Sequence, residues 1–304
     1  MRAVGIILAG GNNNRMKELT HKRAVAAMPI AGSYRSIDFA LSNMTNSHIQ
    51  KVAVLTQYNA RSLNEHLNSS KWWNFGRKQG GLYVFTPTIT NDNGYWYRGT
   101  ADAIYQNMDF LKKSHEPYVV IASGDAVYKM DYSKVLQYHI DKKADVTVVC
   151  KEMDPSDDVS RFGTIRMDDD MRITEFEEKP MVTKSNMIST GIYVIRRRLL
   201  IDLIEHAAEE ERFDFVNDVL IRYKNLKKIY GYKIDHYWSN IATVDAYYKT
   251  NMDFLKPEVR NYFFKQDPEI YSKVSDLPPA KYNPGASVKN SLVGSGSIIN
   301  GTVE

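Results

Sequence analysis

Runs of apolar and β-branched residues alternate with stretches of helical periodicity over about the first 250 residues of the chain. The apolar runs predict strands at Ala3–Leu8, Lys51–Thr56, Tyr118–Ala122, Asp145–Cys150, Gly163–Arg166, Met187–Ile195 and Lys228–Asp235. The periodic stretches predict helices at Ile37–Asn46, Ala60–Asn68, Thr100–Lys113, Tyr132–Lys142, Arg198–Glu210, Asp214–Tyr223 and Thr243–Asn251. This alternation favours an α/β fold, with a doubly wound, mixed but mostly parallel sheet covered by helices on both faces.

The pattern changes near the C-terminal end of the sequence. From Pro278 onward prolines and glycines become frequent and helical periodicity is lost. In residues 286–304 apolar positions recur between small and polar residues, as is typical of the opening of a hexapeptide β-helix. We therefore expect an α/β domain at 1–256, a linker at 257–285 and the beginning of a β-helix at 286–304. Such repeats need several coils to bury a core, so we expect this one to be truncated.

Two candidate ligand loops follow predicted strands. The stretch Ile6–Arg15 reads I-I-L-A-G-G-N-N-N-R, so an apolar run ends at Gly10 and Gly11. Glycines let an anion approach backbone N–H groups, and Arg15 offers a guanidinium nearby, which fits either a phosphate loop or an ordinary strand-to-helix turn. It matches neither the dinucleotide fingerprint nor a P-loop. The second loop, Ser123–Asp125, follows another strand, and the ends of parallel strands meet at one edge of a sheet.

Three further segments carry candidate chemistry. Asp125 is placed to bind Mg²⁺ beside a phosphate, or to stabilise a turn. The segment Trp96–Ala103 sets two aromatics and a glycine before a helix, which fits an anion and base site or a plain helix start. Glu178 and Lys179 stand side by side before Pro180, where they would hold a sugar hydroxyl and a sugar phosphate or form a solvated charge pair.

Composition and charge narrow the classes of function. The 304 residues are 43% hydrophobic and 25% charged, as in an ordinary globular protein. The formal net charge of +4, from 40 basic against 36 acidic residues, is too small and too scattered for a nucleic-acid-binding protein. No apolar run reaches the length of a membrane span, and the first residues lack the pattern of a signal peptide. With Cys150 as the single cysteine, these features favour a cytoplasmic protein with no nucleic-acid or membrane partner.

The order of these segments resembles one enzyme family. The sequences L-A-G-G…R, R-G-T-A-D-A…Q-N, S-G-D and E-E-K-P, followed by a β-helix start, are similar to those of the sugar-nucleotide pyrophosphorylases. The chain most resembles the ADP-glucose pyrophosphorylases (glucose-1-phosphate adenylyltransferases) of glycogen synthesis. The closer matches are Leu19–Ala24, Tyr34–Asn43, Thr56–Tyr58, Tyr128–Tyr132, Ser189–Tyr193 and Tyr237–Trp238. The resemblance covers nearly the whole chain.

The resemblance implies a fold, a reaction and a set of roles. The fold is a sugar-nucleotidyltransferase sheet followed by a left-handed β-helix. The reaction forms ADP-glucose and pyrophosphate from ATP and glucose 1-phosphate with Mg²⁺, by in-line attack of the sugar phosphate on the α-phosphorus. The resemblance implies catalytic roles for Arg15 and Asp125, and metal binding by Asp125. The implied nucleotide-binding residues are Leu8, Gly10, Gly11, Arg15, Gln57, Gly99 and Thr100. Sugar-phosphate contacts are implied for Glu178, Lys179 and Ser189, and activator binding for Lys22 and Arg23.

Three departures from the family pattern fall in this site. Asn13 and Met16 replace a glycine and a leucine of the family loop, and Val25 replaces a lysine beside the phosphates. Asn240 replaces a metal-binding aspartate, and Ser239 the arginine before it. This pattern resembles the D-type companion subunit found beside a catalytic C-type subunit in some bacteria, with Mg²⁺ binding weak or lost. We therefore expect a catalytically impaired regulatory subunit, with ATP or ADP-glucose, glucose 1-phosphate and a sugar-phosphate effector as ligands. The alternatives are an active adenylyltransferase with an altered site and a sugar-phosphate-sensing binding module.

Overall fold

A mixed sheet forms the centre of the molecule in the computed structural model, which describes residues 2–11, 14–76, 80–89 and 94–304. Within these residues the sheet runs in the order β10-β9-β11-β6-β1-β4-β5, with β8 and β12 branching from β11. Its strands are β1 (Ala3–Leu8), β4 (Lys51–Leu55), β5 (Gly81–Phe85), β6 (Tyr118–Ser123), β8 (Val146–Glu152), β9 (Gly163–Met167), β10 (Ile173–Glu178), β11 (Met187–Arg196) and β12 (Ile229–Ile234). The predicted α/β class with a large mixed sheet is confirmed.

Strand direction changes at β11. Strands β6, β1, β4 and β5 are parallel to one another, and β12 is parallel to β8. Strand β11 runs antiparallel to β6, β8 and β9, and β9 antiparallel to β10. A register shift between Ser189 and Tyr193 lets β11 pair with β8 on both sides of a bulge, where Gly191 has a φ of 75°. This bulge lies next to the candidate site.

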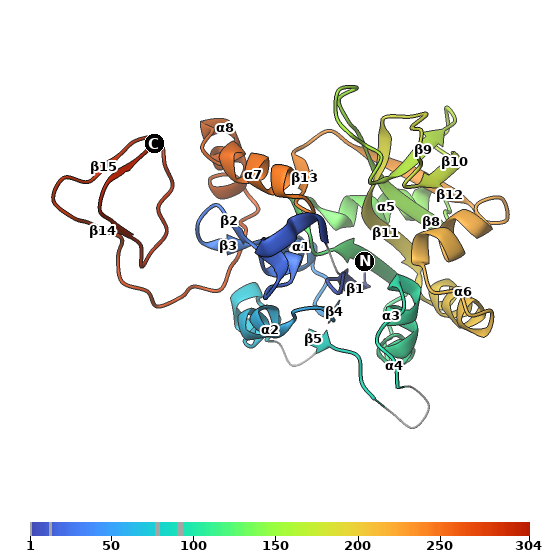
Figure 1. Cartoon of the computed structure of the whole chain (residues 1–304). Coiled ribbons are helices and arrows are strands. Elements are labelled where there is room, and N and C mark those ends of the chain that lie inside the picture. Colours follow the sequence, from blue (N-terminus) through green and yellow to red (C-terminus); the bar gives the residue numbers. More distant parts are fainter. Residues whose placement is uncertain (1, 12–13, 77–79, 90–93) are drawn as a thin grey trace.

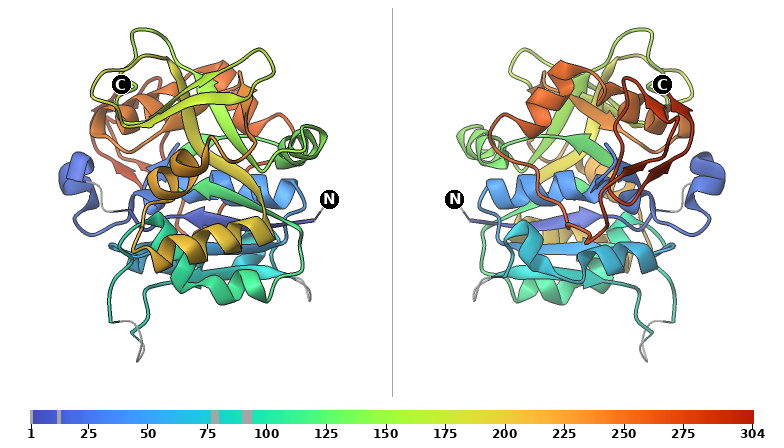
Figure 2. Two further views of the ribbon diagram at one scale, coloured as in Figure 1. Left: turned by 90° about the vertical axis from the view of Figure 1, so that its right-hand side faces the viewer. Right: turned by 90° about the vertical axis from the view of Figure 1, so that its left-hand side faces the viewer.

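Helices cover both faces of the sheet, as Figures 1 and 2 show. One face packs against α1 (Ser36–Asn46), α2 (Arg61–Leu67) and α5 (Tyr132–Asp141). The other packs against α3 (Thr100–Gln106), α4 (Met108–Lys112), α6 (Arg197–Glu209) and the π-helix η4 (Phe215–Ile221). Neighbouring residues of a strand therefore enter different cores: Ile7 packs under α1 and Ile6 under α3. This burial on both faces explains the continuous apolar runs of the sequence.

A third apolar cluster lies beside the sheet and supports the first loop. It joins Met16, Val25 and Phe39 to Phe254 and Phe263. Phe254 directly follows α7 (Val244–Asp253), and Phe263 belongs to α8 (Pro257–Phe264). The remaining short elements are η1 (Asn14–Thr20), η2 (Val25–Ala27), β2 (Pro29–Ile30), β3 (Tyr34–Arg35), η3 (Ser70–Trp73), β7 (Ala126–Tyr128) and β13 (Trp238–Asn240).

The C-terminal segment forms two short parallel pairs of strands, drawn in red at the left of Figure 1. Strand β14 (Lys281–Tyr282) pairs with β16 (Ile298–Ile299), and β15 (Ser287–Val288) pairs with β17 (Thr302–Val303). A chain that returns to lie parallel to itself in this way makes one coil. Among the described residues, no helix combines the length and apolar character that crossing a membrane requires.

Candidate functional site

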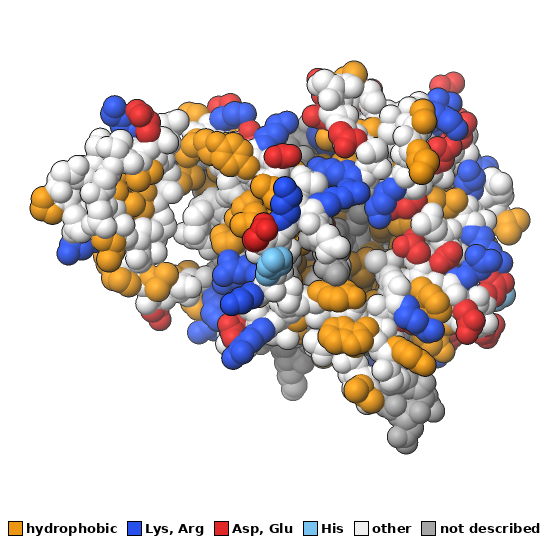
Figure 3. Space-filling model, viewed as in Figure 1, with side chains coloured by type: hydrophobic (Ala, Val, Ile, Leu, Met, Phe, Trp, Pro, Cys, Tyr) orange, Lys and Arg blue, Asp and Glu red, His pale blue; other side chains and the backbone are white. Residues whose placement is uncertain are grey.

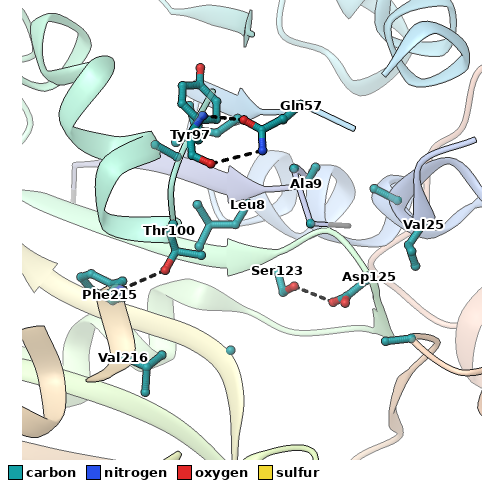
Figure 4. A pocket seen from close by; sticks show the side chains of 18 of the residues that line it. Leu8, Ala9, Val25, Gln57, Tyr97, Thr100, Ser123, Asp125, Phe215 and Val216 are labelled. Carbon is teal, nitrogen blue, oxygen red and sulfur yellow. Dashed lines mark hydrogen bonds between the residues drawn. The ribbon is translucent and has the colours of Figure 1, made fainter. Parts of the chain in front are cut away.

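A cavity of about 700 Å³ opens where β1, β4 and β6 end. It lies at the carboxyl ends of parallel strands, the usual place for a ligand in an open α/β sheet. Figure 3 shows a hollow near the centre of this face, with Lys and Arg side chains gathered beside it, and Figure 4 shows ten of the lining residues from close by. Both predicted loops contribute to its wall, through Gly10 and Gly11 on one side and Asp125 on the other.

The first loop leaves β1 at Leu8 and forms the wall of the cavity. Ala9 N–H donates to the carbonyl of Leu55 at 2.8 Å, which carries the chain over the end of β4. A Cβ at Gly10 would touch Gln57 at 3.4 Å, whereas one at Gly11 would meet no protein atom within 4 Å. Backbone at Gly11 is therefore open to a ligand. Arg15 also lines the cavity.

The loop departures can be located only in part. The Asn13 position lies outside the described residues. Met16, the second departure, is fully buried in the third apolar cluster. There it fixes η1 beneath the cavity floor by packing rather than by polar contact.

Gln57 connects the end of β4 to the segment before α3. Its side-chain amide accepts from Tyr97 N–H at 2.6 Å and donates to the Tyr97 carbonyl at 3.3 Å, as Figure 4 shows. The Gln57 amide thus pairs with the Tyr97 backbone through one donor and one acceptor, as the backbone of a neighbouring strand would. The side chain is oriented by these two bonds, which positions Tyr97 and the following residues along the cavity.

A helix does start at Thr100, and the N–H groups of its first turn are bonded within the protein. The N–H groups of Ala101 and Asp102 donate to the Phe213 carbonyl at 2.8 and 3.3 Å, so they do not face an anion. Thr100 Oγ1 accepts from Phe215 N–H at 2.9 Å and does not cap its own helix. Gly99 allows this contact, because a Cβ there would lie 2.3 Å from the Phe213 oxygen. Gly99, Thr100 and Phe215 all line the cavity.

Asp125 and the Asn240 position face each other across two short strands. Strands β7 and β13 pair antiparallel with Asn240 opposite Ala126, and Ile241 N–H donates to the Asp125 carbonyl at 2.9 Å. Asp125 Oδ1 accepts from Ser123 Oγ at 2.5 Å, as drawn in Figure 4. The resemblance implies one site for these two positions, and the pairing of β7 with β13 brings their backbones side by side.

Arg161, which sequence reasoning missed, contacts the Asn240 side chain and interacts with the charge of Asp125. Its Nη1 donates to Asn240 Oδ1 at 3.3 Å, and its guanidinium stacks over the Phe162 ring at 4.6 Å. Burial lowers the pKa of Arg161, and Arg15 lowers it further, while the Asp125 charge raises it. Arg161, Arg15 and Asp125 therefore lie close enough to interact electrostatically.

The sugar-phosphate candidates are only partly brought together. Lys179 lines the cavity and forms an ion pair with Glu178 at 3.0 Å. Glu178 and Ser189 do not line it. Ser189 is buried, with its Oγ 3.2 Å from Tyr193 Oη, and Tyr193 reaches the cavity instead.

Tyr193 reaches the cavity because of the bulge in β11, which brings Gly191 and Tyr193 to the cavity wall. Burial raises the pKa of the Tyr193 phenol.

Val25 lines the cavity as an apolar side chain, and the predicted regulatory pair lies outside it. Val25 is 8% exposed and packs in the third apolar cluster. Lys22 is exposed. Arg23 lies near Arg35, whose pKa is lowered by burial and then by the Arg23 charge. These two guanidiniums share one region of the surface beside Tyr247, whose pKa Arg23 also lowers.

The protein donors present make a poor site for Mg²⁺, which proteins hold through one or two carboxylates together with waters and substrate phosphates. This ion demands octahedral oxygen coordination, with carboxylates as its protein ligands. Asp125 supplies one carboxylate, while the Asn240 amide oxygen already accepts from Arg161 and from Ala242 N–H at 3.1 Å. Asp245, the other carboxylate considered, is exposed and does not line the cavity. Within the described residues no three His, Cys, Asp or Glu side chains come together.

Several lining residues carried no signal that sequence reasoning could use. Beside Arg161, they are chiefly aromatic or small apolar groups that look like ordinary core residues in the sequence: Phe162, Phe215 and Val216. Tyr58 stood within a recognised match, and its ring stacks on Trp96 at 5.9 Å beside the cavity. Position relative to a strand end would have been their only useful cue.

Comparison with known proteins gives consistent matches. The family model described as nucleotidyl transferase matches residues 4–257. A "Glucose-1-phosphate adenylyltransferase" of Thermosipho melanesiensis is 39% identical over 302 residues, covering 99% of this chain and 73% of its own length. Proteins of the same name from Clostridium novyi and Bacillus thuringiensis are each 40% identical, over 304 and 306 residues. These alignments cover 99% and 100% of this chain, and 79% and 81% of the relatives.

Proposed function

Because the chain belongs to the nucleotidyl transferase family, and within it to the glucose-1-phosphate adenylyltransferases (ADP-glucose pyrophosphorylases), we propose that it is a regulatory, catalytically impaired subunit of that enzyme. The enzyme reaction joins ATP and glucose 1-phosphate into ADP-glucose and pyrophosphate. In this proposal the chain retains a nucleotide cavity formed by Gly10, Gly11, Arg15, Gln57 and Gly99. It contributes regulation to a C-type catalytic partner.

One observation carries the proposal: the two positions that would neutralise phosphate charge hold side chains that do not. Asn240 stands opposite Ala126 and beside Asp125 with its amide oxygen already bonded twice. Val25 packs in an apolar cluster at the cavity wall. Phosphoryl transfer depends almost entirely on positioning and electrostatic stabilisation, so these losses act on the chemical step itself.

The decisive measurement is ADP-glucose formation by the purified chain, alone and mixed with a C-type subunit. Removal of one preorganised electrostatic contact costs on the order of 10²- to 10³-fold in rate. We expect the chain alone to turn over at least about 10²-fold more slowly than the C-type subunit. The double variant Val25→Lys with Asn240→Asp should raise its rate. Val25 borders the cavity, so a lysine there has an exit for its ammonium group.

The relatives favour one other candidate, an active adenylyltransferase with an altered site, because those reported above all carry the enzyme's name. The same assay separates the two. Turnover by the chain alone that equals the C-type rate would refute the regulatory role, and so would a double variant that folds and binds ATP but stays inert. Failure to co-purify with a C-type subunit would instead favour an independent sugar-phosphate-binding module.

Lys22 and Arg23 are proposed to bind the sugar-phosphate effector. The support is that Arg23 and Arg35 bring two guanidiniums near one another, and guanidiniums bind phosphate through paired hydrogen bonds. Arg23→Ala in the mixed complex should raise the effector concentration needed for half-maximal activation. Arg61→Ala is the matched control, because Arg61 is an exposed residue of α2 that pairs with Glu65. An unchanged activation curve for Arg23→Ala would contradict the assignment.

We further propose how the chain is divided and assembled. Residues 1–256 form the nucleotidyltransferase domain, 257–285 a linker, and 286–304 the beginning of a left-handed β-helix. The parallel pairs β14–β16 and β15–β17 support the last assignment, because parallel pairing of successive turns is how such coils stack. The chain would pack against its C-type partner through both units in the cytoplasm. Separate elution of the two co-expressed chains would refute this assembly.

A further inference from the structure

The cavity has a positive balance of charge before any ligand enters. Among its described lining residues, the basic side chains are Arg15, Arg98, Arg161 and Lys179, and the only carboxylate is Asp125. Arg98 is partly balanced by Asp102 and Lys179 by Glu178. Arg161 and Arg15 add positive charge beside Asp125, and the nearby carboxylates of Asp158 and Asp157 offset part of it. A divalent cation entering here meets two cations, whereas a polyphosphate is attracted.

Arg161 is held in place by the protein. Its Nη1 donates to Asn240 Oδ1 at 3.3 Å, and its guanidinium lies 4.6 Å from the centre of the Phe162 ring. Phe162 in turn packs edge-on against Trp238 of β13 at 5.6 Å. Two contacts on different elements thus hold one guanidinium, and little rotamer freedom remains to be lost when a phosphate binds.

The neutral amide at position 240 is what this arrangement requires. An amide oxygen accepts the Arg161 hydrogen bond without cancelling its charge, whereas a carboxylate would neutralise the guanidinium and, with Asp125, offer two acidic ligands to a metal. Asn240 therefore deprives a magnesium site of a carboxylate ligand and, being neutral, leaves the positive charge of the Arg161 guanidinium uncancelled. That charge can then act on phosphate oxygens.

We propose that this cavity binds a nucleoside triphosphate without a divalent cation, and that the Arg161 guanidinium supplies the positive charge beside Asp125 and Asn240. The identity of the nucleotide as ATP rests on the proposed function. A guanidinium binds phosphate oxygens through two parallel hydrogen bonds and carries a single charge. It serves to retain the nucleotide. The cavity is then a metal-independent nucleotide site, distinct in its ion requirement from that of an active subunit.

The first test compares ATP binding to the full chain by isothermal titration calorimetry in excess Mg²⁺ and in EDTA. We expect binding in EDTA at least as tight as in Mg²⁺, since free ATP carries more negative charge than its magnesium complex. Binding that disappears in EDTA would overturn the proposal, and so would no binding in either medium. Neither calorimetric result depends on turnover, so neither would refute the proposed regulatory role. Rapid turnover by the chain alone would refute the regulatory role, but it would not affect the comparison of ATP binding in Mg²⁺ and in EDTA.

The second test uses variants in EDTA. Arg161→Gln should weaken ATP binding about 10- to 100-fold, the range for losing a hydrogen bond to a charged group. Arg166→Gln is the matched control: it makes the same change in charge on β9, where Arg166 is exposed, pairs with Glu175 at 3.6 Å and does not line the cavity. Equal affinities of the two variants would overturn the role of Arg161.

A third variant reverses the ion preference. In the double variant, Arg161→Gln replaces the guanidinium with a neutral amide, and Asn240→Asp adds a second carboxylate to that of Asp125. ATP binding by this double variant should therefore become tighter in Mg²⁺ than in EDTA. Thermal unfolding checks that each variant is folded, and the comparison of media on the unaltered chain stands without any substitution. A double variant that ignores Mg²⁺ would contradict the assignment of this position.

Discussion

Replacing Gly99 with alanine tests how tightly the cavity wall is built. The new Cβ would lie 2.3 Å from the Phe213 oxygen and 2.7 Å from its carbonyl carbon. Both are backbone atoms, so no side chain can turn aside to make room. The φ of Gly99 is −179°, which any residue adopts, so the whole effect comes from this contact. The Phe213 carbonyl must move, and it is the acceptor for the Ala101 and Asp102 N–H groups in the first turn of α3.

The magnitude follows from those two hydrogen bonds. At roughly 0.5–1.5 kcal/mol each, their loss lowers the free energy of unfolding by about 1–3 kcal/mol. At about 2 °C per kcal/mol for a chain of this size, Tm should fall by about 2–6 °C. Hydrogen exchange at the Ala101 and Asp102 amides should accelerate, and ATP binding should weaken because Thr100 and Phe215 share the displaced wall.

The control for this prediction is Gly76→Ala, since a Cβ at the exposed Gly76 would meet no protein atom within 4 Å. Its Tm should match that of the unaltered chain. Two results would refute this reasoning: a Tm of Gly99→Ala equal to that of Gly76→Ala, and an unchanged exchange rate of its Ala101 amide. The close packing of α3 on the Phe213 carbonyl would then not be a property of the protein in solution.

Three other predictions concern buried polar groups. Burial lowers the pKa of His139 from 6.5 to about 4, so the folded state favours the neutral ring. The free energy of unfolding should therefore fall by about 3 kcal/mol as pH drops through that interval. His139→Gln should lose this component of the pH profile of stability, whereas His115→Gln should keep it. Lys129 Nζ donates to two backbone carbonyls at 2.7 and 2.5 Å in and after α8; Lys129→Met should cost about 2 kcal/mol in urea unfolding and speed hydrogen exchange in α8, and exposed Lys265→Met should do neither. Burial raises the pKa of the Cys150 thiol to about 12, so iodoacetamide should alkylate it only in denaturant; labelling of the native chain at the rate of a free thiol would contradict this burial.

The sheet was readable from the sequence where strands are buried on both faces. Strands β1, β4 and β6 form continuous apolar runs, and their predicted positions agree with the structure to within a residue. Strand β5 was missed because its five residues lie at the sheet edge and are half-exposed. Strand β10 was missed because its sequence, I-T-E-F-E-E, buries only Ile173 and Phe176.

Local side-chain bonds changed two predicted helices. The single helix expected at Thr100–Lys113 is broken at Asn107, whose Nδ2 donates to the Ala103 carbonyl and to Tyr97 Oη, both at 2.9 Å. The helix expected at Asp214–Tyr223 is a π-helix at Phe215–Ile221. Hydrophobic periodicity indicates neither the side-chain hydrogen bonds that break a helix nor the change from α-helical to π-helical geometry.

The candidate site shows the same division. Gly10, Gly11 and Asp125 were found because glycines and a carboxylate after a strand have a direct physical meaning. Arg161 was missed because it precedes a predicted strand rather than following one, and its contact with Asn240 joins residues 79 positions apart in the sequence. Long-range placement of this kind follows from topology, and a spacing along the chain does not encode it.

Strand β11 has a consequence for how the chain folds as it leaves the ribosome. It closes the open side of β6, and 63 residues separate the end of β6 at 123 from the start of β11 at 187. At roughly 5–20 residues per second, synthesis takes about 3–13 s to cover that interval. During this time the β6 edge lacks its native neighbour, with Val119 to Ile121 presenting unpaired backbone groups. A chaperone that binds extended apolar segments should therefore associate with nascent chains that end between β6 and β11, and release them once β11 has emerged.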